Sequence, residues 1–260
     1  MQLEFGGHTI DLLEKLYRTA QLIGYRKSYL ARLKLRNYSK ILDLGIGTAA
    51  NTLLILEQYP GAVIDGTDRS FEMLYHSRTK LRSLGFRNQV RLVCLDAHQL
   101  HLPRRRYDFA IVSQVISYLE NPVLVLRKLA TCMKENGRVL LEDSDWESFI
   151  YNSGGHSAWK KIRESWLLQS LRVDAGRRLK EFAVEAGLRV DQCAGVHLQD
   201  DSFDENRYGY WLAMIIAEFV TRNGMVSRDE AQGWLTQLSQ LSRRGGYYFG
   251  LNRMSVIAVA

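Results

Sequence analysis

The stretch ILDLGIGTAA, residues 41–50, holds the residue types and spacing that most clearly suit ligand binding. Gly45 and Gly47 stand one residue apart, directly after an apolar run that is typical of a strand, and Asp43 precedes Gly45 by two residues. Glycines in a strand-to-helix turn let a ligand approach the backbone closely. The helix that follows offers free N–H groups to an anionic group. The turn formally matches the G-x-G-x-x-G/A dinucleotide pattern, which has little weight alone.

A repeated alternation of strands and helices surrounds this turn and predicts the framework that positions it. Five short strands are expected at residues 40–45, 62–68, 89–97, 107–113 and 138–143. Helices are expected at residues 49–59, 70–85 and 121–137. Near-continuous apolar strands of this kind belong in a parallel sheet that helices cover on both faces. Right-handed crossovers favour a doubly wound sheet, in which ligands bind at the carboxyl ends of the strands.

The rest of the chain adds two strands and several helices to this framework. Strands are expected at residues 189–198 and 247–260, and helices at 9–35, 155–171, 176–187, 204–223 and 227–243. We therefore predict an α/β fold, a Rossmann-like, doubly wound, mostly parallel seven-stranded sheet with an N-terminal helix and helical lid insertions. Residues 1–260 form a single domain in this prediction. Its core is about 36–145, 175–200 and 246–260, and its lid elements are 9–35, 146–172 and 201–245.

Three aspartates at neighbouring strand ends indicate what the turn could bind. At Asp43 a carboxylate would repel a pyrophosphate at close range and favour a cationic group such as an α-amino group. Asp68 ends the second strand, at the position that accepts ribose hydroxyls in such folds. Asp96 ends the third strand and can accept a hydrogen bond from an exocyclic amine. Together they suit a ligand that has an adenosine and an amino-acid tail and lacks phosphates.

Five motifs in order resemble those of class I S-adenosylmethionine-dependent methyltransferases. They cover roughly residues 38–145 and read ILDLGIGTAA, GTDRSFEML, VRLVCLDAHQLHLP, YDFAIVSQVISYLENP and NGRVLLED. The remainder is similar to the small-molecule, UbiE-like branch through DSDW after the fifth strand, the GRRLKEFAVEAGL helix and the terminal strand pair. The resemblance implies an enzyme of the EC 2.1.1 type that uses S-adenosyl-L-methionine and releases S-adenosyl-L-homocysteine.

The resemblance also implies roles for particular residues. Gly45 and Gly47 form the turn around the methionine part of the cofactor, and Asp43 orders that turn and faces the amino group, often through water. Asp68 holds the ribose hydroxyls, and Asp96 meets the adenine amine. The complete expected cofactor set is Tyr17, Asp43, Gly45, Gly47, Thr48, Asp68, Arg69, Met73, Asp96, Ala97, His98, Ser113 and Gln114.

The resemblance implies further roles for other members of this set. Arg69 and Met73 flank the ribose and adenine, while Ser113 and Gln114 border the sulfonium. Tyr17, on the first helix, is expected to reach the cofactor carboxylate as that helix closes over the site. The resemblance is incomplete at one position of the turn itself, where Ala49 replaces the usual third glycine.

The catalytic residues are unassigned, and four residues are weak candidates. Tyr118 stands where relatives often have His. Asp143 and Asp145 follow the fifth strand, where the acceptor should bind, although solvated loop acids or a helix cap would explain them equally well. His156 has the pKa range of a general base, but a surface histidine is the plainer interpretation. The histidines do not form a metal-binding spacing, so no metal is proposed.

The lid elements are expected to build the acceptor pocket. Six aromatic residues in them either line such a pocket or simply pack helices together: Trp146, Trp159, Trp166, Tyr208, Tyr210 and Trp211. Their abundance favours in-line methyl transfer to a small, partly apolar organic acceptor of the natural-product or metabolite type. Helical lids also serve as dimer surfaces, so a homodimer is left open.

Composition excludes several classes and leaves others open. No stretch approaches the roughly 20 apolar residues of a membrane span, and the N-terminus does not read as a secretory signal. Three separated cysteines argue against a disulfide framework and favour the cytoplasm. The net charge of +7 and the run Arg104, Arg105 and Arg106 keep an RNA methyltransferase as an alternative, although a nucleic-acid partner is not expected. A dinucleotide-binding oxidoreductase and a non-catalytic cofactor-binding protein are the alternatives from other classes.

Overall fold

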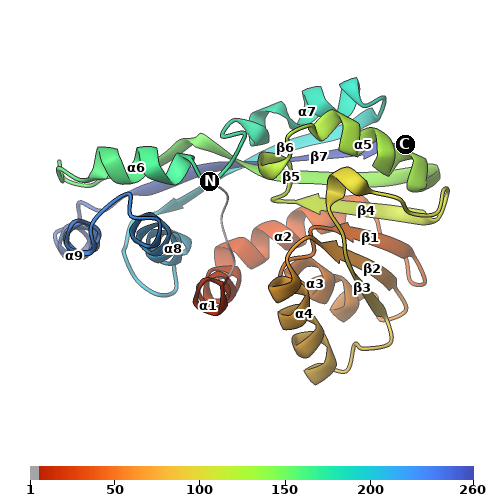
Figure 1. Cartoon of the computed structure of the whole chain (residues 1–260), viewed down its shortest axis with the longest axis horizontal. Helices are drawn as coiled ribbons and strands as arrows, with labels where there is room; N and C mark the ends of the chain where they lie inside the picture. The colour runs from red at the N-terminus through yellow and green to blue at the C-terminus, as the bar shows by residue number, and fades with distance from the viewer. Residues whose placement is uncertain (1–5) are drawn as a thin grey trace.

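A seven-stranded sheet with helices on both faces forms the centre of the computed structural model, which describes residues 6–260 (Figure 1). The strands are β1 (Lys40–Leu44), β2 (Val63–Asp68), β3 (Val90–Cys94), β4 (Tyr107–Ser113), β5 (Met133–Tyr151), β6 (Arg189–Asp200) and β7 (Phe249–Val259). The α-helices are α1 (Gly7–Tyr17), α2 (Ala20–Leu33), α3 (Ala50–Gln58), α4 (Phe71–Ser83), α5 (Pro122–Cys132), α6 (Trp159–Leu167), α7 (Ala175–Glu185), α8 (Tyr208–Arg222) and α9 (Arg228–Arg243). Two short 3-10 helices are η1 (Ala97–Gln99) and η2 (Ile116–Tyr118).

The sheet has the strand order β3-β2-β1-β4-β5-β7-β6. Strands β1 to β5 pair in parallel, and β7 runs antiparallel to both β5 and β6. This arrangement confirms the predicted Rossmann-like, mostly parallel seven-stranded sheet. The chain reverses its direction of winding between β1 and β4, and an open α/β sheet binds ligands in the crevice at such a switch point.

Alternate residues of the strands feed two separate cores. Ile41 of β1 packs in the core that includes α1 to α4, whereas its neighbour Leu42 packs in the core beneath α5 and α7. Side chains of a strand point alternately to the two faces of its sheet, so this division places helices on both sides. Figure 1 shows the same division, with α5 and α7 on one face and α2, α3 and α4 on the other. Strands β1 and β4, which contribute to both cores, are thereby fixed on both sides, and their carboxyl ends form a rigid edge.

Four helices, α1, α6, α8 and α9, form a helical lobe beside the β5 and β7 end of the sheet (Figure 1). The long strands β5 and β7 extend into this lobe, where the Tyr151 hydroxyl at the end of β5 donates to the carbonyl of Gly209 on α8 at 2.6 Å. The rings of Trp159 on α6 and Trp234 on α9 stack with their centroids 5.4 Å apart. Aromatic packing therefore joins the lobe to the sheet.

Three boundaries differ from those expected from the sequence. The helix expected at 9–35 is broken into α1 and α2 because Thr19 is extended (φ −62°, ψ 138°) and its hydroxyl donates to the Leu16 carbonyl at 2.8 Å. The helix expected at 121–137 ends at Cys132, where β5 begins. The fifth strand continues to Tyr151 instead of ending at 143, because β7 pairs with it along nearly its whole length. The acids at 143 and 145 therefore lie inside a strand.

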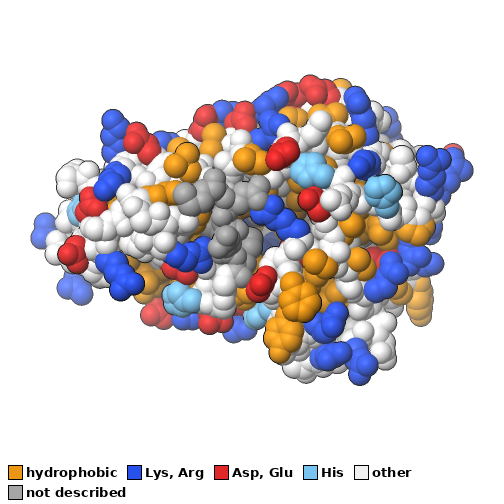
Figure 2. Space-filling view, in the orientation of Figure 1, with side chains coloured by type: hydrophobic (Ala, Val, Ile, Leu, Met, Phe, Trp, Pro, Cys, Tyr) orange, Lys and Arg blue, Asp and Glu red, His pale blue; other side chains and the backbone are white. Residues whose placement is uncertain are grey.

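Two kinds of feature are missing from the part of the chain that the structure describes. No helix of residues 6–260 is long and apolar enough to cross a membrane. The same residues contain no group of three or more His, Cys, Asp or Glu side chains that could hold a metal ion. On the face that Figure 2 shows, Lys and Arg side chains are scattered over the molecule with Asp and Glu between them.

Candidate functional site

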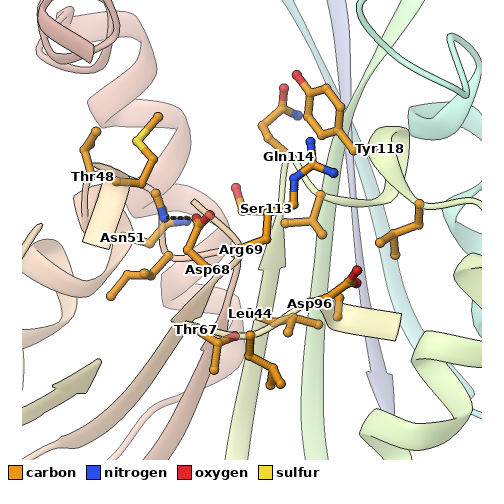
Figure 3. A pocket seen from close by; sticks show the side chains of 18 of the residues that line it. Leu44, Thr48, Asn51, Thr67, Asp68, Arg69, Asp96, Ser113, Gln114 and Tyr118 are labelled. Carbon is orange, nitrogen blue, oxygen red and sulfur yellow. Dashed lines mark hydrogen bonds between the residues drawn. The ribbon is translucent and has the colours of Figure 1, made fainter. Parts of the chain in front are cut away.

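A pocket of about 420 Å³ opens where β1, β2 and β4 end, at the switch point of the sheet. Figure 3 shows how side chains from these strand ends converge on it. Every residue of the expected cofactor set lines this pocket except Asp43, and Tyr118 lines it as well. The residues that line it but were not predicted are Arg26, Leu44, Ile46, Ala50, Asn51, Thr67, Leu95, Val115, Leu119 and Glu120.

The glycine turn between β1 and α3 forms one wall of the pocket. Gly45 and Gly47 have φ values of +76° and +54°, in the left-handed region that favours glycine. A Cβ atom on Gly45 would lie 2.3 Å from Cγ2 of Val115, so only glycine fits there. The N–H of Gly45 donates to the carbonyl of Thr67 on β2 at 2.7 Å, which ties the turn to the neighbouring strand. Ala49 is also left-handed, at φ +61°, although it carries a methyl group.

Asp68, the last residue of β2, presents its carboxylate to the same wall (Figure 3). One oxygen, Oδ2, accepts from the N–H of Gly47 at 2.9 Å, and the other, Oδ1, accepts from the N–H of Ser70 at 2.9 Å. Burial raises the pKa of Asp68, and these two N–H groups oppose that rise. Each carboxylate oxygen has two lone pairs, so Asp68 can still accept further hydrogen bonds from hydroxyl groups. The sequence placed this residue correctly in the pocket wall.

Asp43, in contrast, lies behind the turn and does not line the pocket, although it was expected to face a ligand there. Its side chain is 2% exposed, and its Oδ2 accepts from the Thr52 hydroxyl of α3 at 2.7 Å. Burial raises the pKa of Asp43 to about 6, and the negative charge of Asp68 adds to that rise. Asp43 therefore links β1 to α3 from below. The carboxylate that stands beside the turn N–H groups is that of Asp68.

Asp96 follows β3 and lines the pocket about one strand further along the edge. It accepts from the N–H of His98 at 2.8 Å and lies 3.1 Å from the Nδ1 atom of the same residue. The His98 N–H lowers the pKa of Asp96, and the half-exposed side chain is ionised at neutral pH. An ionised carboxylate at this place can accept a hydrogen bond from an amine.

Arg26 is the most informative residue that the sequence prediction missed. It lies on α2, is 5% exposed, and its guanidinium sits over the Tyr17 ring with its carbon 4.2 Å from the ring centre. Its Nε atom has no hydrogen-bond partner among residues 6–260. A buried cation that faces a pocket without a partner is suited to an anionic group of a ligand. The available signal was that Arg26 interrupts the buried stripe of α2 that includes Leu22, Tyr29 and Leu30.

The end of β4 is held by buried charged side chains of β5. The Ser113 hydroxyl donates to Oε2 of Glu142 at 2.7 Å, and Glu142 is paired with Arg253 of β7, whose Nε lies 2.9 Å from Oε1. Gln114 has a left-handed φ of +56°, which is strained for a residue with a side chain. Its Nε2 donates to Oδ1 of Asp143 at 3.2 Å. Strain that surrounding contacts hold in place is common where a site is preorganised.

Tyr118 closes the pocket on the side of η2. Its hydroxyl donates to Oε1 of Gln169 at 2.8 Å, and Gln169 is fully buried in the segment after α6. Burial and the negative charge of Asp143 raise the pKa of Tyr118 well above its ordinary value. Tyr118 is therefore a neutral phenol at physiological pH and not a base. Gln169 was not predicted, because only the folded chain brings it to the Tyr118 hydroxyl.

The other three catalytic candidates do not reach the pocket wall. Asp143 is fully buried within β5, where it accepts from the N–H of Ser117 at 3.0 Å, and burial together with Glu142 raises its pKa to about 7. Asp145 is paired with Arg177 of α7 at 2.8 Å. The two acids are thus buried strand residues and not the solvated loop acids or helix cap that the sequence suggested.

His156 and the aromatic residues of the lid elements also lie away from the pocket. His156 accepts at Nδ1 from the N–H of Ala158 at 3.3 Å, at the start of α6. Trp146 and Trp166 pack edge to face, with ring centroids 5.4 Å apart, inside the core of the helical lobe. None of the six aromatic lid residues lines the pocket. Of the two interpretations of these aromatic residues, the packing of helices is therefore the one that fits the structure.

Comparisons with known proteins identify the same region. A family described as a methyltransferase domain matches residues 42–139. Demethylmenaquinone methyltransferase of Geobacillus stearothermophilus is 28% identical over 193 residues, which cover 68% of this chain and 82% of that enzyme. Malonyl-[acyl-carrier protein] O-methyltransferase of Legionella pneumophila is 28% identical over 127 residues, 49% of this chain and 40% of that enzyme. The chain covers 33 to 49% of the length of three of the curated relatives that it matches.

A solved structure with the same fold belongs to the [4+2]-cyclase SpnF. It has a TM-score of 0.61 and 18% sequence identity, and the match covers 90% of this chain and 79% of that one. Such a low identity shows the fold alone. The matched domain, the strand order and the five ordered motifs agree with one another, and all residues that line the pocket except Tyr17, Arg26 and Asn51 belong to the motifs. Residues 42–139 therefore form a methyltransferase domain of the class I S-adenosylmethionine-dependent kind, and the demethylmenaquinone methyltransferases are among the distant relatives of the chain.

Proposed function

We propose that the protein transfers a methyl group from S-adenosyl-L-methionine to a nucleophile on a small, partly apolar organic acceptor. The observation that carries this proposal is the Asp68 carboxylate in the pocket wall, bonded to the N–H of Gly47 at 2.9 Å. A carboxylate that can accept hydrogen bonds from hydroxyl groups thus lies beside the glycine turn, where a ligand can approach the backbone closely. The names of the relatives support a small-molecule acceptor but differ from one another in the acceptor they specify.

The residues of the pocket fit the cofactor at three points. Asp68 suits the two ribose hydroxyls, and Asp96 suits the amine of adenine. Arg26 suits the carboxylate of the methionine part, because its buried guanidinium has an Nε without a partner among the described residues. We therefore assign the carboxylate to Arg26 and give Tyr17 the role of supporting its guanidinium from below.

The task of the protein in this reaction is alignment. S-adenosyl-L-methionine, when bound, supplies a methyl group that a positively charged sulfur already activates. Orientation of two reactants can lower a barrier by about 7–11 kcal/mol. The chain contributes a rigid sheet edge, the strained Gln114 and the neutral phenol of Tyr118, all of which line the pocket. A general base is needed only if the acceptor must lose a proton, and none is assigned here.

We also propose that the acceptor enters beside Tyr118, Leu119 and Glu120. These residues line the pocket, yet the three cofactor contacts do not require them. The lid element 9–35 contributes Tyr17 and Arg26 to the pocket, so it covers the methionine end. In this proposal the elements 146–172 and 201–245 influence the acceptor indirectly. The first does so through Gln169, which holds the Tyr118 hydroxyl, and the second through the packing of α8 against α1.

A dinucleotide-binding oxidoreductase fits the site less well. Its pyrophosphate would need the free N–H groups of the glycine turn. Here the N–H of Gly47 already donates to the carboxylate of Asp68, which would repel a phosphate at close range. This argument replaces the one from Asp43, which lies behind the turn.

An RNA methyltransferase also fits less well. The arginine run 104–106 immediately precedes β4, at the amino end of a strand whose carboxyl end forms the pocket. Arg106 is paired there with Asp65, with 3.1 Å between its NH2 atom and Oδ2. Basic side chains are scattered over the face in Figure 2, with acidic side chains between them. Steep salt dependence of RNA binding would favour this alternative instead.

Isothermal titration calorimetry with three ligands tests the proposal. We expect S-adenosyl-L-methionine and S-adenosyl-L-homocysteine to bind the purified protein and NADH not to bind. Binding of NADH with neither of the other two would show that the pocket serves a dinucleotide. Binding of the cofactor without formation of S-adenosyl-L-homocysteine across a panel of phenols, amines and carboxylic acids would favour a non-catalytic cofactor-binding protein.

A further inference from the structure

Lys80 of α4 connects the first helix to the glycine turn. Its Nζ atom lies 2.7 and 2.8 Å from the two carboxylate oxygens of Glu14 on α1, and it donates to the carbonyl of Thr48 at 3.3 Å. Glu14 is 8% exposed. Its burial opposes ionisation, but the hydrogen bonds and charge of Lys80, with contributions from Thr48 and His76, outweigh that effect, and the pKa of Glu14 is lowered. An ionised, nearly buried pair thus spans α1, α4 and the wall of the pocket.

The same face of α4 holds two successive carbonyls of the turn. The Ser77 hydroxyl donates to the carbonyl of Gly47, and Lys80, three residues later, donates to the carbonyl of Thr48. Residues three apart lie on one face of a helix, so one face of α4 binds both carbonyls of the turn. With these carbonyls held toward α4, the N–H of Gly47 points to Asp68 in the pocket wall. The carbonyl of Gly47 is held by Ser77 and not by Lys80, whose contact with the turn is the 3.3 Å bond to Thr48, so the Asp68 end of the turn does not depend on Lys80.

Apart from this pair, α1 belongs by its packing to the helical lobe. It packs mainly against α8, and the Thr9 hydroxyl near its start donates to Oε1 of Glu218 on α8 at 2.9 Å. A second hollow, lined by Ile10 of α1 and by Phe71 and Tyr75 of α4, lies between the earlier turns of the two helices. The exposed aromatic rings there leave that part of the interface loosely filled. Glu14 is thus where α1 is attached to the half of the molecule that carries the glycine turn.

The attachment lies next to a residue that lines the pocket. Tyr17 is three residues after Glu14 on the same helix, lines the pocket, and has the guanidinium of Arg26 over its ring. We infer that Glu14 and Lys80 are positioning residues for the methionine end of the cofactor site, because their ion pair fixes α1 and so holds Tyr17 and Arg26 in place. This inference rests on the proposed function. It predicts that the pair affects recognition of the amino-acid part of the cofactor and leaves recognition of the nucleoside part unchanged.

Two ligands that differ only at the methionine end separate these effects. S-adenosyl-L-homocysteine carries the amino-acid tail, and 5′-deoxy-5′-methylthioadenosine lacks it. For Lys80→Met, we expect calorimetry to show affinity for the first ligand reduced about tenfold and affinity for the second changed less than about twofold. Lys134→Met is the matched control, because Lys134 forms an ion pair of the same 2.7 Å length with Asp108 away from α1 and should change neither affinity.

A double variant tests whether the pair acts through Arg26. If it does, Lys80→Met should weaken binding of S-adenosyl-L-homocysteine by less than about twofold when Arg26→Met is already present. Glu14→Gln keeps the size of the side chain and should reproduce the loss in part, about threefold, if Lys80→Met does not fold. Equal weakening of both ligands, or no selective loss in either single variant, would overturn the inference. If the unaltered protein bound neither ligand, the proposed function itself would fail, which is a distinguishable result.

Discussion

The two walls of the pocket are built in different ways. The sheet-edge wall comes from the ends of β1 to β4 and consists of glycine turns and aspartates that accept or orient backbone N–H groups. The helical wall comes from α1 and α2 and consists of the long side chains of Tyr17 and Arg26, which touch each other and approach the pocket from a separate part of the fold. One wall is fixed by backbone geometry, whereas the other depends on how helices pack.

This difference assigns each wall to one end of the cofactor. The acids of the sheet edge suit the neutral, hydroxyl-bearing and amine-bearing nucleoside. The guanidinium of the helical wall suits the carboxylate of the amino-acid tail. Changes in the first wall should therefore weaken every adenosine-containing ligand, and changes in the second should act only on ligands that carry the tail.

The largest effect is expected from Asp68→Ala in the sheet-edge wall. The change removes an acceptor for two ribose hydroxyls and also the carboxylate that binds the N–H of Gly47. Hydrogen bonds to charged groups contribute about 1.5–3 kcal/mol each, so affinity for S-adenosyl-L-homocysteine should fall about a hundredfold or more. Methylthioadenosine should lose affinity by a similar factor. Calorimetry with both ligands measures this, and Asp108→Ala, at the opposite end of β4, is the control. Unchanged affinity would mean that β2 does not supply the ribose contact.

A second effect is expected from Asp43, which lies behind the sheet-edge wall and should affect stability more than ligand binding. Burial raises its pKa from 3.8 to about 6, a difference of about 2.2. A folded-state pKa above the unfolded value means that ionisation destabilises the fold, so this contribution to stability falls as pH rises from about 4 to about 6. At about 1.36 kcal/mol per pKa unit, the loss is at most about 3 kcal/mol.

The variant Asp43→Asn lacks this titration. As pH rises from 4 to 6.5, the free energy of unfolding of the variant should therefore increase relative to that of the unaltered protein. Urea unfolding at several pH values measures the difference, in which other titrating groups cancel. The affinity of the variant for S-adenosyl-L-homocysteine should change by only a few-fold. Parallel pH profiles, or a large loss of affinity, would return Asp43 to the ligand-facing role that the sequence suggested.

A third effect tests the helical wall directly. Arg26→Met keeps the buried stem of the side chain but removes the guanidinium over Tyr17. The loss of one charged hydrogen-bonding partner should weaken binding of S-adenosyl-L-homocysteine about thirtyfold and leave methylthioadenosine unaffected. Arg32→Met on the same helix is the control, because Arg32 donates to Ser255 and does not line the pocket. Equal losses for the two ligands would show that the two walls do not divide the cofactor.

The smallest effect is expected at the turn itself. Ala49 is left-handed at φ +61°, a conformation that costs an alanine roughly 1–2 kcal/mol. Ala49→Gly relieves that strain but adds freedom to the unfolded chain, so thermal unfolding should show a net gain of about 0.5 kcal/mol. Binding should change less than twofold. Gly45→Ala is the contrasting variant, because its Cβ would lie 2.3 Å from Val115 and should disrupt the turn. A clear destabilisation by Ala49→Gly would show that the methyl group matters for packing.

The same contrast explains how much the sequence could predict. Each strand end carries its functional residue within a few positions, so the strand pattern placed Gly45, Asp68 and Asp96 at one edge without knowledge of any long-range contact. Arg26 reaches the pocket, and Gln169 reaches Tyr118 of the pocket wall, only because segments far apart in the chain pack together, and no local pattern encodes that packing.

The errors have the same origin. Asp43 was expected to face the ligand because its position along β1 was clear, but the face of the sheet to which it points depends on α3 and Thr52. Asp143 was placed at the end of the fifth strand, with a loop acid as one interpretation, because the pairing of β5 with β7 that extends the strand to Tyr151 joins residues about a hundred positions apart. Parallel strands, turns and glycines could thus be predicted locally, whereas the orientation of buried polar side chains could not.

A crystal structure of the protein with S-adenosyl-L-homocysteine tests the central claim most directly. The account predicts the ribose hydroxyls at the Asp68 carboxylate, the adenine amine at Asp96 and the carboxylate of the ligand at the guanidinium of Arg26. A ligand bound elsewhere, or one whose carboxylate lies away from Arg26 while its adenosine occupies the sheet edge, would contradict it.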